Sequence, residues 1–118
     1  MKLTIKRDQA DVKGMFGGHK GVSFSLYAKA DITKDERELI EHYKIGEHIL
    51  ASYDLPIKGS ESMEGNLSVN RLMNGTNIAT DSISTLLELE EKIKEGCQNL
   101  KTLLKVMKTF GGEEVIEI

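Results

Sequence analysis

Apolar and polar residues alternate with a two-residue period in two stretches near the start of the chain. Leu3 and Ile5 alternate with lysine and threonine, and residues 22–28 place Val, Phe, Leu and Ala at every second position. This period is typical of strands that bury one face. Four glycines lie between positions 14 and 21. We therefore predict that the two stretches pair as a hairpin around a glycine-rich loop.

The middle of the chain combines a short helical pattern with short extended ones. Residues 33–36, Thr-Lys-Asp-Glu, have the form of a capping box, in which side chains satisfy backbone amides at a helix start. Gly46 is a suitable end for that helix. Residues 48–53 are predicted to form a strand, and residues 67–71 another, which ends at an Asn-Gly turn signal.

A long amphipathic helix is the strongest pattern in the sequence. It is predicted to begin near Thr80-Asp81-Ser82, which are good N-cap residues, and to end at Phe110 before two glycines. With Ile83 as the first heptad position, the a and d sites are apolar over four heptads except at Glu90. Gly96 either bends this helix or permits a close crossing. The apolar residues proposed as an interface are Ile83, Leu86, Ile93, Cys97, Leu100, Leu104 and Met107.

These elements predict a single α+β domain over residues 1–118. Residues 1–79 would be mainly a small antiparallel sheet with a short helix, residues 80–110 the long helix, and residues 113–118 an edge strand. About 30 helical residues span roughly 45 Å, whereas a domain of this size has a radius of gyration of about 13–14 Å. The helix is therefore expected to overhang its own sheet.

A second copy of the chain could cover that overhang. Acidic residues are concentrated in the first half of the helix and lysines in the second half, so two copies attract each other when they lie antiparallel. We therefore predict a homo-oligomer in which the long helices pair in antiparallel fashion around a two-fold axis. The alternative is a helix that covers only its own sheet.

Charge and composition exclude several classes of function. Sixteen Lys and Arg residues are outnumbered by nineteen Asp and Glu residues, which argues against a nucleic-acid-binding protein. No run reaches the roughly 18 apolar residues of a membrane span, and no signal segment is evident. Cys97 is the only cysteine, so no internal disulfide can form. A cytoplasmic protein without membrane contact is expected, in the host cytosol if a phage encodes it.

Motifs of common enzymes and metal sites are absent from the sequence. There is no G-x-S-x-G and no H-E-x-x-H motif. His19, His42 and His48 share no metal-ligand spacing with Cys97. We therefore assign no catalytic residue and expect no metal and no cofactor. The acidic clusters, including the one around Glu90, are interpreted as solvated surface.

Two segments are candidate sites for an anionic ligand. The glycine-rich loop lacks the order of a P-loop and precedes a strand, but apolar and cationic side chains on one tip suit a lid over an anionic ligand with a ring. The segment before the long helix carries Arg, Asn and Thr side chains toward a helix N-terminus, which attracts anions. An ordinary hairpin tip and ordinary capping chemistry are the alternatives. The candidate ligand-binding residues are Phe16, His19, Lys20, Arg71, Asn74, Thr76 and Asn77.

The order of these elements in a small acidic chain resembles that of the Thoeris anti-defence sponge proteins of phages. The resemblance covers the layout of most of the chain. It implies a non-catalytic oligomer that sequesters a phosphorylated signal, such as a cyclic nucleotide or cyclic ADP-ribose, without cleaving it. Such pockets hold phosphates with arginines, and the long helix has none here. The alternatives are a structural or adaptor oligomer that binds another protein through its long helix, and an enzyme of unrecognised type.

Overall fold

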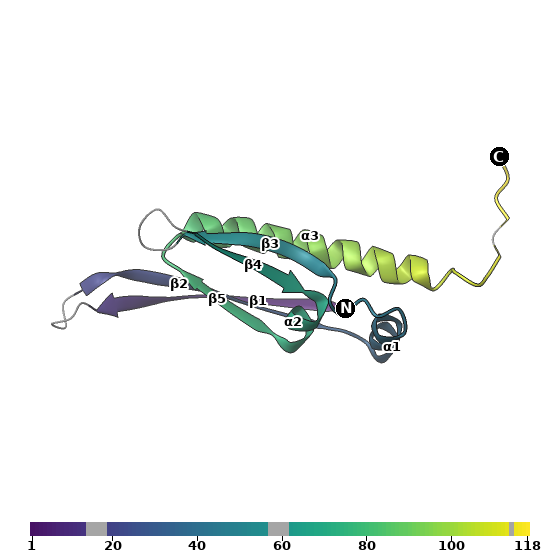
Figure 1. The fold of residues 1–118 in the computed structure, drawn as a ribbon, viewed down its shortest axis with the longest axis horizontal. Helices are drawn as coiled ribbons and strands as arrows, with labels where there is room; N and C mark the ends of the chain where they lie inside the picture. Colours follow the sequence, from purple (N-terminus) through teal and green to yellow (C-terminus); the bar gives the residue numbers. More distant parts are fainter. Residues whose placement is uncertain (14–18, 57–61, 114) are drawn as a thin grey trace.

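The protein is α+β, and its hairpin β1–β2 belongs to a three-stranded antiparallel sheet (Figure 1). The computed structural model describes residues 1–13, 19–56, 62–113 and 115–118, without the side chains of 12–13, 19–20, 56 and 62–64. The sheet has the order β1-β2-β5. Its strands are β1 (Lys2–Lys13), β2 (His19–Asp31) and β5 (Thr76–Thr80).

The hairpin extends beyond the strand that supports it. β5 pairs only with Phe24–Ala28 of β2, while β1 and β2 stay paired as far as Lys13 and His19. The far part of the hairpin is therefore two-stranded and projects from the body (Figure 1). The predicted hairpin is confirmed, with strands longer than the alternation alone indicated. The molecule measures 70 × 28 × 23 Å.

A second sheet contains two antiparallel strands, β3 (Ile49–Pro56) and β4 (Ser62–Ser68). The strand predicted over residues 67–71 is wrong after Ser68, because the helix α2 (Val69–Asn74) begins there. The Ser68 hydroxyl accepts a hydrogen bond from the backbone amide of Arg71 at 3.2 Å and so caps that helix. Val69 and Leu72, three positions apart, are both buried.

The short helix α1 (Lys34–His42) begins at the predicted capping box. The Thr33 hydroxyl accepts a hydrogen bond from the amide of Glu36 at 3.2 Å, and the Glu36 carboxylate accepts one from the amide of Thr33 at 2.9 Å. The helix ends earlier than predicted, and Lys44, with a φ of 54°, takes the left-handed conformation that was expected at Gly46.

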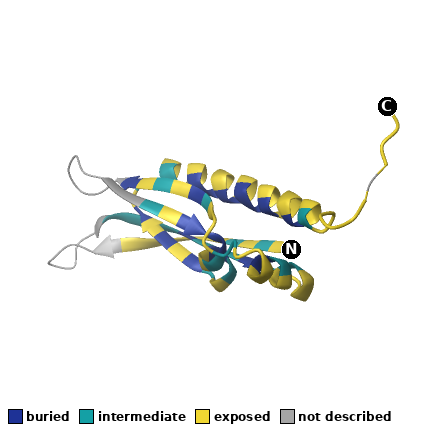
Figure 2. Cartoon of the chain, turned by 45° about the vertical axis from the view of Figure 1, so that its right-hand side comes forward, coloured by how far each residue is buried: buried dark blue, intermediate teal, exposed yellow. Residues whose placement is uncertain are grey.

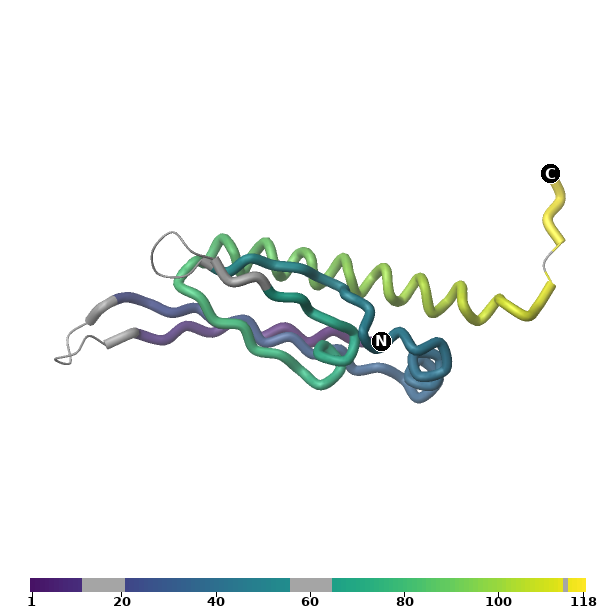
Figure 3. The backbone as a smooth tube through the Cα atoms, viewed as in Figure 1, coloured from purple at the N-terminus to yellow at the C-terminus, as the bar shows by residue number. Residues whose placement is uncertain are grey.

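The long helix α3 (Ile83–Met107) lies along both sheets and is continuous through Gly96 (Figures 1 and 3). Ser82, one of the predicted N-cap residues, caps its start. The helix ends at Met107, three residues before the predicted Phe110. Its buried residues face the sheets and its exposed residues face outward (Figure 2). The side of α3 that the heptad pattern marked as apolar is therefore the side that meets this chain's own strands.

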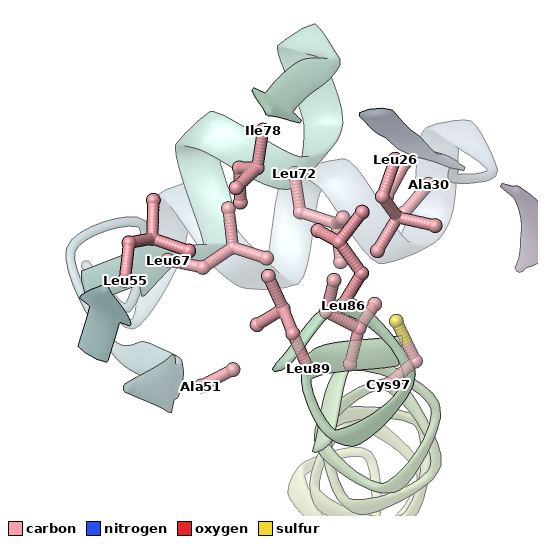
Figure 4. Packing of buried hydrophobic residues seen from close by; sticks show 12 residues of the cluster. Leu26, Ala30, Ala51, Leu55, Leu67, Leu72, Ile78, Leu86, Leu89 and Cys97 are labelled. Carbon is pink, nitrogen blue, oxygen red and sulfur yellow. The ribbon is translucent and has the colours of Figure 1, made fainter. Parts of the chain in front are cut away.

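The core has two parts, both closed by α3. In the first, Leu86, Leu89 and Ile93 of α3 pack against residues of both sheets and against Leu72 of α2 (Figure 4). In the second, the end of α3 packs against α1 and α2. The buried residues of this second cluster are Ile40, Val69, Leu100 and Leu104. One helix thus joins the two sheets and the two short helices into one body.

Most residues predicted to form a dimer interface lie in this core. Ile83 is exposed, Met107 is half-buried, and the others are buried in the chain's own core. The single chain therefore matches the alternative in which α3 covers its own sheets, and pairing with a second copy stays a prediction. The predicted interface residues that are buried here are Leu86, Ile93, Cys97, Leu100 and Leu104.

The edge strand predicted over residues 113–118 is not formed in this structure. After α3 the chain runs through turns to Gly112, and residues 115–118 adopt neither strand nor helix. The segment leads away from both sheets (Figure 1). An isolated edge strand gains its hydrogen bonds only from a neighbour, and none of the strands in the described part of the chain pairs with this segment.

Candidate functional site: a groove between β1 and α3

The predicted anion site around Arg71 has a structural role in this chain. The Arg71 guanidinium donates to the backbone oxygen of Asn66 at 2.7 Å and to the hydroxyl of Thr76 at 3.2 Å. These bonds tie the end of β4 to the start of β5. Thr76 is buried, whereas Asn74 and Asn77 are exposed. The guanidinium expected to hold a phosphate is therefore already paired within the protein.

The same segment also lies away from the helix end that was expected to assist it. The whole of β5 separates residues 71–75 from the N-cap Ser82. Sequence reasoning treated residues 76–80 as part of a loop and so placed these side chains too close to the helix. The other candidate residues, Phe16 and the side chains of His19 and Lys20, lie outside the described part of the structure.

A buried carboxylate joins α3 to β1. Glu90 is only 4% exposed. Its Oε1 accepts a hydrogen bond from Arg7 Nε at 2.6 Å, and its Oε2 accepts one from Arg7 Nη2 at 2.7 Å. Lys94 Nζ lies 3.3 Å from Oε2. The interpretation of Glu90 as solvated surface is therefore wrong, because a cation on β1 and another one turn along α3 replace water around it.

These cations determine the protonation state of Glu90. The paired hydrogen bonds from Arg7 hold the pKa of Glu90 below its usual value, although burial acts in the opposite direction, and Lys94 lowers the pKa further. The same bridge raises the pKa of Arg7. A carboxylate held in its ionised form is a poor general acid near neutral pH. The cluster is therefore suited to binding and positioning rather than to proton transfer.

Two hollows lie on either side of this bridge, between β1 and α3. The first, of about 80 Å³, is mainly apolar, with Arg7 and Glu90 in its wall. The second, of about 210 Å³, has Lys94 and Lys101 beside Leu3 and Cys97. We call the two hollows and the bridge the β1–α3 groove. The other lining residues of the first hollow are Asp8, Phe24, Ser25, Leu26, Ile83, Leu86 and Leu87.

The groove has an apolar floor, and its border carries Arg7, Lys94 and Lys101 together with Asp8 and Glu90. Its chemistry is that of a binding surface. The sulfur of Cys97 is a poor nucleophile at neutral pH, since burial raises the pKa of its thiol to about 11. Among the described residues, no group of three or more His, Cys, Asp or Glu side chains is arranged to hold a metal ion. None of the helices in the described part of the chain is long and apolar enough to cross a membrane.

Comparisons of the chain with protein-family models, with curated proteins and with solved structures found no match. The bridge, the two hollows and the strand beside them therefore indicate what the protein can bind. Sequence reasoning missed this site. Its single signal was Glu90, the one charged residue in an otherwise apolar heptad seam.

Proposed function

We propose that the protein is a non-catalytic, oligomeric binding protein whose β1–α3 groove holds an anionic, partly apolar ligand. The observation that carries this proposal is the apolar lining of the two hollows beside Lys101. Arg7 and Lys94 lie along the same border, where both are paired with Glu90. Cations above an apolar floor favour a ligand that has both negative charge and apolar groups.

The shape of the groove favours an extended peptide segment of a protein partner. The hollows measure about 80 and 210 Å³, which is below the roughly 300–1,000 Å³ typical of pockets that enclose a small molecule. The second hollow follows β1 and α3, as a groove for an added strand does, and the first continues between α3 and both β1 and β2. This corresponds to the adaptor alternative, in which the chain binds another protein through its long helix. The binding surface is here on the β1 side of that helix.

A phosphorylated small molecule is the second candidate ligand. The cations that would bind a carboxylate also bind phosphate, and the resemblance noted above implies a cyclic nucleotide or cyclic ADP-ribose signal of phage counter-defence. Binding without cleavage is consistent with a groove whose carboxylate, Glu90, stays ionised and paired.

Thermal-shift titration with an acidic six-residue peptide, cyclic nucleotides and ADP-ribose species tests both candidates. A ligand present at about 100 times its Kd stabilises the folded state by about 2.7 kcal/mol. We expect Lys101→Glu to weaken binding about tenfold, which corresponds to about 1.4 kcal/mol. Lys92→Glu is the matched control, because Lys92 lies on the opposite side of the same helix, beside Ser52 of β3. Equal binding by both variants, or no shift with any of these ligands, would exclude the proposal.

A further inference from the structure

The last residues of the chain expose apolar side chains that nothing in the single chain covers. Residues 113–118, Glu-Glu-Val-Ile-Glu-Ile, combine three acidic with three branched apolar residues. Val115 is 83% exposed, Ile116 is 69% exposed, and Ile118 is fully exposed. The segment leads away from the end of α3 (Figures 1 and 3). A short run of branched apolar residues has high strand propensity, and it forms a stable strand only when it pairs with another strand.

The outer edge of β1 offers such a partner. Within the described part of the chain, β1 is hydrogen-bonded to β2 alone, so the backbone groups on its other side are open to an added strand. Leu3 and Ile5 are half-buried against the core beside that edge. Lys2, Lys6 and Arg7 supply positive charge, and no acidic residue lies between positions 2 and 7.

The charges on this edge select the kind of strand that can pair with it. Lysines on an edge strand normally prevent sheets from joining edge to edge, because a neutral strand that paired there would have to cover the charged side chains. For an acidic strand the same charges are attractive. Segment 113–118 and β1 residues 2–7 contain six residues each, so both span about 20 Å when extended. Length, charge and apolar content therefore match.

The alternation of side chains along residues 113–118 fits the β1–α3 groove as well as the β1 edge. In an extended strand, Ile116 and Ile118 share one face, while Val115 and Glu117 share the other. With the isoleucines turned toward α3, they meet the hollow that contains Leu3 and Cys97. Glu113 and Glu117 then share the opposite face with the exposed Lys2 and Lys6 of β1.

We propose that residues 113–118 of one copy of the chain add as a strand to the β1 edge of a second copy and fill its β1–α3 groove. A second copy is the occupant because the isolated chain directs its own segment away from β1 (Figure 1). The inference rests on the proposed function and names the groove's ligand. It also replaces the predicted pairing of long helices with an exchange of strands.

Truncation after Gly112 tests the exchange. The full chain is expected to form dimers or larger assemblies in a concentration-dependent way by light scattering, and the truncated chain to remain a monomer. The circular dichroism of the two should agree, since the removed residues lie outside both core clusters. The same assembly state for both chains would overturn the proposal, as would a full chain that stays monomeric.

A disulfide trap identifies where the segment binds. Leu3 lines the same hollow, so a chain with both Leu3→Cys and Ile116→Cys is expected to form an interchain disulfide between the two new thiols under mild oxidation, which peptide mapping detects. Leu3→Cys with Val115→Cys is the matched control, because the side chain of residue 115 faces the other way in the same strand. Equal trapping of both variants, trapping only within one chain, or no trapping would contradict the proposal.

A peptide experiment separates this inference from the proposed function. The truncated chain is expected to bind the synthetic peptide Glu-Glu-Val-Ile-Glu-Ile, and Lys101→Glu to weaken that binding about tenfold. Binding of another acidic peptide or of a nucleotide, but not of this one, would overturn the strand exchange and leave the proposed function standing. If the truncated chain bound none of them, both would fail.

Discussion

The two sides of α3 meet the two sheets in different ways. On the β3 side the helix approaches the strand so closely that a Cβ at Gly96 would lie 2.6 Å from the backbone oxygen of Leu50. On the β1 side the Arg7–Glu90 bridge joins helix and strand through long side chains, and hollows remain on either side of it. Hollows of about 290 and 260 Å³ flank the Gly96 contact as well. The two sides therefore differ in what joins helix to strand, which is direct backbone contact on one side and a charged bridge on the other.

This difference separates stability from binding along a single helix. A direct backbone contact, as at Gly96, leaves no room for a larger side chain at that position, so a substitution there disturbs the packing of helix on strand. A charged bridge with apolar hollows beside it leaves both area and charge available to a partner. We therefore expect substitutions on the β3 side to change folding and substitutions on the β1 side to change binding.

The largest expected effect comes from the residue that both sides share. Ile93 is completely buried in the first core cluster, so Ile93→Ala should reduce the free energy of unfolding by about 2–5 kcal/mol through lost burial and a residual cavity. Leu87→Ala is the control, because Leu87 is 50% exposed and should cost about 0.5 kcal/mol. Urea denaturation measures both. Similar losses would mean that α3 does not pack on the sheets in this way.

A smaller effect is expected at the close contact with β3. Alanine at Gly96 would favour the helix by about 1 kcal/mol, but its Cβ would force the Leu50 backbone to move. Overpacking of this kind costs about 1–3 kcal/mol, so we expect Gly96→Ala to be destabilising overall in urea denaturation. Gln98→Ala, at an exposed position of the same helix, should be nearly neutral. A more stable Gly96→Ala protein would show that helix and strand can separate enough at Leu50 to accept the added methyl group.

The smallest effect on folding is expected at the bridge, and it depends on pH. The pKa of Glu90 is lowered in the folded state, mainly by hydrogen bonds from Arg7. Its contribution to stability is therefore complete above the ordinary carboxyl value of 4.5 and is lost as the pH falls through the lower, folded-state pKa.

The variant Glu90→Gln makes this contribution measurable. It should be less stable than the unaltered chain at pH 7, by less than Gly96→Ala, because Arg7 is largely exposed and water weakens its attraction. The difference should shrink as the pH falls below about 4.5. Urea denaturation at several pH values tests this, and a difference that stays constant with pH would show that Glu90 is not ionised in the bridge.

Local patterns predicted much of the fold. The hairpin, the capping box at Thr33 and the start of α3 at Ser82 were all correct, because each depends on residues close together in the sequence. The strand predicted from the alternation at residues 67, 69 and 71 was wrong, because Ser68 caps a helix there. The sequence signal for that cap is weak, since the third helical position is not a glutamate and no capping box is present.

The strand β5 was missed for a related reason. Its inward positions are Thr76, Ile78 and Thr80, and only one of these three is apolar. Because two of the inward residues are threonines, the segment shows no alternation of apolar and polar residues, and a hydrophobicity pattern predicts a polar loop. Pairing with Phe24–Ala28 of β2 supplies the hydrogen bonds and the burial that the strand's own composition does not announce.

The candidate site was beyond local patterns altogether. Arg7 and Glu90 are 83 positions apart, and nothing near either residue indicates the other. Glu90 interrupted the apolar heptad, which marks it as unusual, but the same position on a surface helix would be ordinary. Its role follows only from the placement of β1 beside α3, which depends on the whole fold.

The position of α3 after both sheets in the chain has a consequence for how the protein is made. Both sheets emerge from a ribosome before the helix that covers them. Until α3 has emerged, the inner faces of the strands have no cover, so the nascent chain is expected to be exposed to chaperones during that interval. The two core clusters would then close together, because both need residues of α3.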